Sequence, residues 1–143
     1  MSTLLEILDE KGHEVLRIDA SASVLEAVKQ MVEANVGSLV VTDHGEDVGI
    51  VTERDYLRRV ALSGRTQEGI AVREIISSPL IVATRDTTVD ECMALMTDRR
   101  IRHVPVVDGD KLVGIVSIGD LVKFTSKLQS FEIKYLTDYI TSY

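Results

Sequence analysis

The chain has 143 residues, of which 45% are hydrophobic, and this length and composition are those of one ordinary folded domain. No apolar run approaches the roughly 18 residues that a membrane span needs, and the N-terminus lacks a signal-peptide pattern, so we expect a cytoplasmic protein that does not enter a membrane. The net charge of −7 disfavours nucleic acid and anionic membranes as partners, and any bound anion must be held by a local cationic patch.

The first half of the chain is expected to follow the order strand, helix, strand, strand, helix. Apolar residues at helical spacing predict the helices, and β-rich runs separated by turn-forming residues predict a hairpin. The expected elements are a short capped helix over residues 4–8, a strand over 15–18, a helix from Ser21 or Ser23 to about Ala34, strands over 38–42 and 48–52, and a helix from Glu53 to about Leu62. A linker is expected at residues 63–71.

The second half repeats this order. The expected elements are a helical turn over residues 72–76, a strand over 80–83, a helix over 89–99, a hairpin around residues 108–110 and a helix from Ile118 onward. The last helix carries an apolar stripe that the first half lacks, made of Leu121, Phe124, Leu128, Phe131, Tyr135, Leu136 and Tyr139. Such a stripe usually marks an interface, so we predict a homodimer, with packing of the stripe onto its own module as the alternative.

An internal duplication underlies the repeated order. Residues 23–57 and 88–122 are two copies of one segment, 65 positions apart without a gap, and each copy ends in Gly-apolar-apolar-Thr/Ser-x-x-Asp. Two copies of one unit usually bury a shared apolar face. We therefore predict an α+β fold of two tandem β-α-β-β-α repeats, packed as one pseudo-twofold module with a C-terminal helical extension. The predicted boundaries are residues 1–65 for the N-terminal helix and first repeat, 66–126 for the linker and second repeat, and 127–143 for the extension.

The repeated motif places an aspartate three positions after a hydroxyl residue, Thr52 before Asp55 and Ser117 before Asp120. The hydroxyl lies where a strand gives way to a helix, and the free N–H groups and the dipole of a helix start favour a phosphate. The aspartate can accept two hydrogen bonds from the vicinal diol of a ribose. The same spacing is also that of a plain helix cap, so ligand binding and capping both remain open.

A cationic cluster precedes the strand of the second hairpin, and it consists of Arg99, Arg100, Arg102 and His103. The corresponding residues of the first copy are neutral. Grouped cations are costly in an acidic protein unless they meet an anion or pair with acids, which indicates an anion site. The alternative is a solvated helix end whose arginines interact with the helix dipole.

These features resemble a cystathionine-β-synthase (CBS) domain pair of the stand-alone type. The resemblance rests on the two motifs, the strand from Arg102 to Asp108 and the repeated element order, and it covers about residues 3–125. It implies two clefts between the repeats that bind adenine nucleotides or related adenosyl ligands, and a regulatory rather than a catalytic role.

Carried over residue by residue, the resemblance implies that Asp120 binds the ribose and that Ser117 approaches the phosphate, whose charge meets Arg102 or His103. The adenine of this cleft is implied to lie near residues 11–16 and near the strand start that holds Val36 and Ser38.

In the other cleft, the resemblance assigns the ribose to Asp55 and the phosphate to Thr52, with the base near residues 77–82 and near Ile101 to His103. The phosphate must there rely on Arg54 or another basic side chain, because neutral residues replace the cationic pair. We therefore expect the Asp120 cleft to bind nucleotide more tightly.

The leading hypothesis is a regulatory module without a required cofactor, which senses AMP, ADP, ATP or a related adenosyl compound such as NADH or S-adenosylmethionine and alters an unidentified partner protein. The alternative is a ligand-independent dimerisation or interaction scaffold. We predict no catalytic or metal-binding residues, because His13 and His44 have no partners at metal-ligand or triad spacing, and an enzyme that hydrolyses nucleotides would need a general base or a metal. The single cysteine, Cys92, is expected to be a small buried apolar residue.

Overall fold

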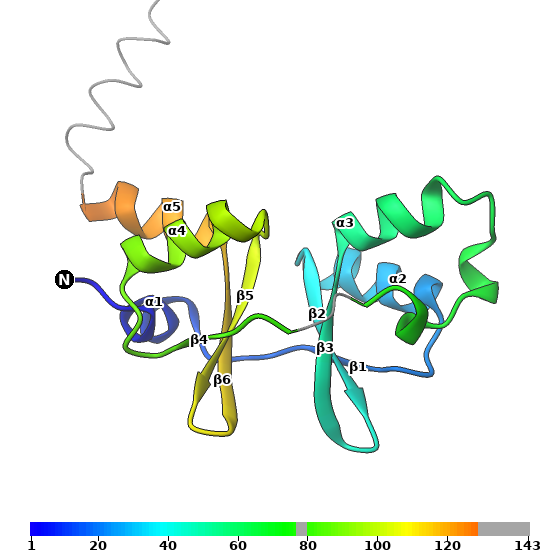
Figure 1. Ribbon diagram of the computed structural model, residues 1–143, viewed down its shortest axis with the longest axis horizontal. Helices are drawn as coiled ribbons and strands as arrows, with labels where there is room; N and C mark the ends of the chain where they lie inside the picture. The colour runs from blue at the N-terminus through cyan, green and yellow to red at the C-terminus, as the bar shows by residue number, and fades with distance from the viewer. Residues whose placement is uncertain (77–79, 129–143) are drawn as a thin grey trace, which may run out of the picture. The chain divides into compact units, whose positions relative to one another are not determined.

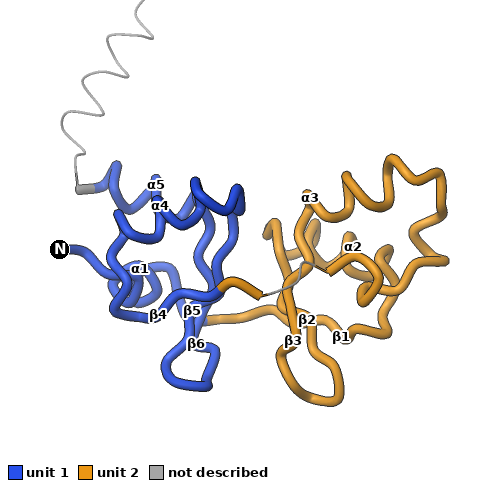
Figure 2. Tube along the Cα trace, in the orientation of Figure 1, with its two compact units in different colours: residues 1–13, 82–143 blue, residues 14–81 orange. Residues whose placement is uncertain are grey.

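The computed structural model describes residues 1–76 and 80–128 and divides into two compact units (Figure 2). One unit contains Glu14–Ile81, and the other contains Met1–His13 together with the chain from Val82 onward. Each unit contains one copy of the predicted strand, helix, strand, strand, helix order (Figure 1), so the α+β fold with two repeats is confirmed.

The unit Glu14–Ile81 is built on a three-stranded sheet in the order β1-β2-β3, in which β1 is parallel to β2 and β2 is antiparallel to β3. The elements are β1 (Arg17–Asp19), α2 (Val24–Ala34), β2 (Ser38–Asp43), β3 (Glu46–Thr52), α3 (Glu53–Tyr56), a π-helical turn (Leu57–Ala61) and two 3₁₀ turns (Gln67–Gly69 and Val72–Glu74). Ser23 begins α2 by accepting a hydrogen bond from the Glu26 N–H at 3.1 Å, and the left-handed Asn35 ends it.

The other unit has an equivalent sheet in the order β4-β5-β6 with the same strand directions. The elements are α1 (Leu4–Lys11), β4 (Ala83–Thr84), α4 (Val89–Arg99), β5 (His103–Asp108), β6 (Lys111–Ser117) and α5 (Ile118–Leu128). The hairpin register shifts between Val41 and Thr42 in one unit and between Val106 and Val107 in the other, 65 positions later. The duplication therefore preserved even the β-bulge.

The segment that precedes the first strand of each repeat packs on the other repeat. The Leu4 N–H donates to Thr87 O at 2.9 Å, and the Val72 N–H donates to Ala22 O at 2.8 Å. Ala22 and Thr87 occupy the same position of the two repeats. The helix α1 thus lies in the same unit as residues 82–128, and residues 66–76 lie in the same unit as the first repeat. The boundaries 1–65 and 66–126 follow the repeats along the sequence and stay a prediction.

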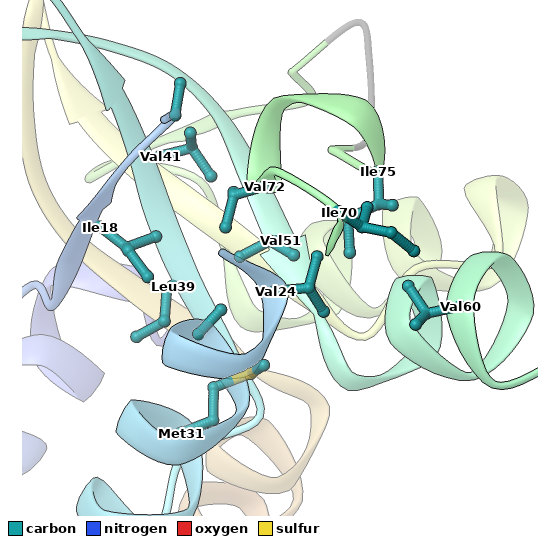
Figure 3. Close-up of a cluster of buried hydrophobic side chains, with 12 residues drawn as sticks. Ile18, Val24, Met31, Leu39, Val41, Val51, Val60, Ile70, Val72 and Ile75 are labelled. Carbon is teal, nitrogen blue, oxygen red and sulfur yellow. The ribbon is translucent and has the colours of Figure 1, made fainter. Parts of the chain in front are cut away.

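Each unit has its own apolar core. In the unit Glu14–Ile81 the core lies between the sheet, α2 and the segment around Val72 (Figure 3), and it contains Ile18, Val24, Ala27, Met31, Leu39, Val41, Val51, Val60, Ile70, Val72 and Ile75. Ile70 is 1% exposed, so the predicted linker contributes a core residue and is not a simple connection. In the other unit the core contains Leu4, Ile7, Leu8, Val89, Cys92, Met96, Val104, Val106, Val116 and Leu121. Cys92 is buried as predicted.

The predicted apolar stripe on the last helix is only partly described. Leu121 is buried and Phe124 packs against the core of its own unit, which agrees with the alternative prediction for these two side chains. The side chain of Leu128 and the residues Phe131, Tyr135, Leu136 and Tyr139 lie outside the described part of the chain. Among the described residues, no helix is long and apolar enough to cross a membrane.

Candidate functional site

The two copies of the motif form the same reciprocal helix cap. In the second repeat the Ser117 N–H donates to Asp120 Oδ2 at 2.8 Å, and the Asp120 N–H donates to Ser117 Oγ at 3.1 Å. In the first repeat the corresponding distances between Thr52 and Asp55 are 2.9 and 3.2 Å. The capping interpretation is therefore correct for both copies, and it fixes each carboxylate beside the start of a helix.

The carboxylate of Asp120 has a second partner that the sequence did not indicate. The Lys11 ammonium lies 2.6 Å from Asp120 Oδ2 and also donates to Ile115 O at 2.8 Å. Burial acts to raise the pKa of Asp120, but the hydrogen bonds from Lys11 and Ser117 outweigh it and leave that pKa below its ordinary value. The carboxylate is therefore held ionised and in a fixed orientation.

The edge of the second sheet is covered by the end of α1 and the residues that follow it. His13 Nδ1 lies 3.2 Å from Val113 O, two residues before the carbonyl that Lys11 binds, and His13 Nε2 lies 2.9 Å from Asp9 Oδ1. The hydrogen bonds with Asp9 and then with Val113 raise the pKa of His13. His13 thus has structural partners on α1 and on β6. Among the described residues no group of three or more His, Cys, Asp or Glu side chains could hold a metal ion.

The predicted phosphate partners lie beside the cap of the second repeat. His103 pairs with Ser117 across β5 and β6, and the Ile118 N–H donates to Arg102 O at 2.8 Å. The side chain of Arg102 is exposed, and that of His103 is partly buried. The structure therefore brings together the four residues that were expected to bind one nucleotide. We call these residues, with Lys11, the Asp120 site: Lys11, Arg102, His103, Ser117 and Asp120.

The other two members of the cationic cluster have different surroundings. Arg99 lies at the end of α4 and pairs with Asp98 at 3.5 Å, and Arg100 is the left-handed residue that ends this helix, with φ of 55°. These two arginines agree with the helix-end interpretation. His103 begins the strand β5 and pairs with Ser117, and Arg102 directly precedes that strand.

The corresponding residues of the first repeat are arranged in the same way. Ser38 pairs with Thr52 across β2 and β3, and the Glu53 N–H donates to Gly37 O at 3.0 Å. Arg54 is exposed in the first turn of α3, one residue before Asp55. Val36 and its counterpart Ile101 each follow the left-handed residue that ends a helix. Of the segment 77–82 predicted to contact a base, residues 77–79 lie outside the described part of the chain.

The Asp120 site combines groups that suit a phosphorylated nucleoside. An ionised carboxylate can accept hydrogen bonds from a diol, while a helix start, a hydroxyl and an exposed guanidinium suit an anion. Lys11 is the member that sequence reasoning did not assign to the carboxylate. A short repeat in the sequence, in which residues 2–8 align with residues 70–76 and share Glu at positions 6 and 74 and Ile at positions 7 and 75, indicates that the two segments are equivalent, but it does not include Lys11.

Comparison with known proteins agrees with this description. The CBS domain family matches the chain twice, at residues 6–62 and 72–127. A relative from Arabidopsis thaliana, the CBS domain-containing protein CBSX3, mitochondrial, is 38% identical over 97% of this chain and 72% of its own length. The solved structure of a protein with CBS domains from Burkholderia ambifaria is 42% identical, with a TM-score of 0.84 over 87% of this chain and 93% of that one.

A third protein shows what a similar structure binds. The CBS domain pair of MJ0100 was solved in complex with 5′-methylthioadenosine and S-adenosyl-L-methionine, and it is 29% identical, with a TM-score of 0.76 over 89% of this chain and 98% of that one. Stand-alone members of this group are typically regulatory. On the two family matches and these similarities, the chain belongs to the CBS domain family and is a CBS domain pair.

Proposed function

We propose that this CBS domain pair is a regulatory module, not an enzyme, which binds AMP, ADP, ATP or a related adenosyl ligand and thereby modulates a partner protein. The observation that carries the proposal is that a hydrogen-bonded carboxylate, a helix start and the two basic residues Arg102 and His103 lie together in the Asp120 site. The adenosyl ligands of the MJ0100 domain pair support the ligand class. NADH and S-adenosylmethionine remain alternative ligands.

In this proposal each of these residues contacts one part of the nucleotide, either the ribose or the phosphate. Asp120 accepts hydrogen bonds from the ribose diol, and Ser117 with the first N–H groups of α5 meets the phosphate. Arg102 and His103 add charge-assisted hydrogen bonds to the same phosphate, each contributing about 1.5–3 kcal/mol when well formed. Ligand binding regulates a partner only if the ligand has different affinities for two arrangements of the module.

The test is titration calorimetry with AMP and adenosine on the wild type and on single variants. Asp120→Ala should abolish the tighter binding event, and Asp55→Ala should spare it. Arg102→Ala should weaken AMP about tenfold or more while changing adenosine little, because it removes a phosphate contact only. Asp110→Ala, in an exposed hairpin turn, is the matched control. Equal losses from the two site aspartates would overturn the assigned roles.

A ligand-independent scaffold is the second candidate function. It is favoured by the observation that both motifs form complete helix caps from the chain's own groups. A thermal-shift screen over adenine and guanine nucleotides separates the two functions, because a ligand at a hundredfold excess over Kd stabilises the native state by about 2.7 kcal/mol. No shift with any nucleotide would favour the scaffold.

The cellular location is also a proposal. We expect a cytoplasmic protein, whereas the relative from Arabidopsis thaliana is named as mitochondrial. Subcellular fractionation with an antibody against the native protein decides between the two compartments.

A further inference from the structure

The ammonium of Lys11 is a fixed positive charge within the Asp120 site. It is held by two acceptors on the second repeat, Asp120 Oδ2 at 2.6 Å and Ile115 O at 2.8 Å. A lysine ammonium has three N–H donors, so one donor remains for a further acceptor. The side chain of Lys11 is 35% exposed and that of Asp120 is 24% exposed, so a bound molecule can reach both without unfolding the helix.

The sequence duplication does not repeat this lysine. When residues 2–8 are aligned with residues 70–76, position 11 corresponds to Pro79. A proline side chain carries no charge and no donor. Lys11 is therefore a specialisation of the second repeat's site and not a requirement of the repeated fold.

The position of the lysine changes the charge that a ligand meets. A lone ionised aspartate attracts a cationic group and repels a phosphate, and the repulsion is strong near a partly buried carboxylate. The Lys11 ammonium neutralises that negative charge by pairing directly with the Asp120 carboxylate. Arg102 directly precedes β5, its side chain is exposed and its carbonyl accepts from the Ile118 N–H at the start of α5, so it adds a second positive charge to this end of the helix.

We propose that Lys11 is the residue that selects the ligand's charge at Asp120, so that this site prefers adenosyl ligands with a negatively charged 5′ substituent over neutral or cationic ones. The inference rests on the proposed function and deepens it, since it distinguishes nucleotides from 5′-methylthioadenosine and S-adenosylmethionine. Lys11 acts by its fixed charge, and the ribose contact of Asp120 is common to all three ligands.

The test compares ligands that share adenosine and differ at the 5′ position: AMP, 5′-methylthioadenosine and S-adenosylmethionine. Their Kd values are measured by calorimetry on the full chain as wild type, Lys11→Met and Lys11→Arg. Methionine keeps an unbranched apolar stem without the charge, and arginine keeps the charge. Lys127→Met is the matched control, because it removes the same charge from a lysine that pairs with Glu10 on α1 and not with Asp120.

We expect Lys11→Met to weaken AMP about tenfold, to change 5′-methylthioadenosine less than about threefold and to strengthen S-adenosylmethionine. Lys11→Arg should restore most of the preference for AMP, and Lys127→Met should leave it unchanged. The AMP affinity of Lys11→Met should also depend less on salt concentration than that of the wild type.

Three results would overturn the inference. An equal gain for all three ligands would show that Lys11 only competes for the carboxylate, and an equal loss would show that it only supports the fold. An equal change of preference in Lys127→Met would show that the effect comes from net charge alone. If the wild type bound none of the three ligands, the proposed function itself would be wrong. If it bound them with a preference that Lys11→Met does not change, only the inference about Lys11 would be wrong.

Discussion

Leu8 of α1 packs directly against the backbone of Gly114 in β6. A Cβ atom at residue 114 would lie 2.6 Å from Leu8 Cδ2 and 2.8 Å from Leu8 Cδ1. Leu8 is fully buried in the core of its unit and has little room to move aside. Gly114, the glycine of the second copy of the motif, thus forms the surface on which α1 packs.

Gly114→Ala is expected to destabilise the protein by about 1–3 kcal/mol, because the added methyl group overpacks the contact with Leu8. Gly119→Ala is the matched control: its Cβ would meet only Ser117 Oγ at 3.6 Å, an ordinary contact. Alanine in this exposed first turn of α5 should leave stability unchanged or raise it by about 0.5–1 kcal/mol. Denaturant unfolding without ligand measures both effects, and equal stabilities of the two variants would contradict the close packing.

Because α1 packs with the second repeat and the segment around Val72 packs with the first, a mutation in either segment should destabilise the repeat that it contacts. We call this arrangement the exchange of segments. Leu4→Ala should cost about 2–5 kcal/mol and should increase amide hydrogen exchange in residues 82–128, far away in the sequence. Val72→Ala should cost about 2 kcal/mol and should increase exchange in residues 14–62.

Two controls accompany this pair. Val32 and Val122 are 74% and 50% exposed, so replacing either with alanine should change stability by less than about 0.5 kcal/mol. Hydrogen exchange that rises next to each mutation in the sequence, rather than in the opposite repeat, would contradict the exchange of segments.

The ion pair at Asp120 predicts a pH dependence of stability. The folded-state pKa of Asp120 is below the ordinary value of 3.8, so its contribution is complete above that value and is lost as the pH falls through the lower folded pKa. At neutral pH we expect the Lys11→Met/Asp120→Asn double-mutant cycle to give a coupling of at most about 1 kcal/mol, because both side chains are partly exposed. The coupling should vanish in acid, and a coupling that stays constant would rule out the ionised pair.

Cys92 is expected to be unreactive in the folded protein. It is fully buried, and burial raises the pKa of its thiol to about 11. A thiol reagent near neutral pH should label it slowly in the native state and completely in denaturant. Because Leu4 belongs to the same core, Leu4→Ala should accelerate the native-state labelling. Fast labelling of the native wild type would show that the core opens more readily than its packing implies.

We also predict that the protein is a homodimer. Leu57 and Val122 occupy the same position of the two repeats and are 58% and 50% exposed, which adds to the apolar residues of the C-terminal extension.

Light scattering at micromolar concentration should return the mass of two chains. Truncation after Ser126 should weaken the dimer, and so should the double substitution Leu57→Asp and Val122→Asp. Val32→Asp, on an exposed part of α2, is the control. A monomer mass for the wild type would contradict this prediction.

Local sequence patterns predicted most elements because short-range physics decides them. The helix over 89–99 matches the observed α4, and the hairpin strands are correct because alternating β-rich runs and turn residues act within a few positions. The strand predicted at 80–83 was observed at Ala83–Thr84, and the predicted helix from Glu53 continues after Tyr56 as a π-helical turn. The exact residues at which a strand or helix ends depend on tertiary contacts, which local secondary-structure propensities do not describe.

The sequence by itself determined the duplication, the order of elements, the family and the pairing of each hydroxyl with its aspartate, since these follow from residues close together in the chain. Only the tertiary structure decided that α1 packs with the second repeat and that Lys11 neutralises Asp120, 109 positions away. The physical reason is that an ion pair or a core contact requires proximity in space, which the spacing of residues along the chain does not encode.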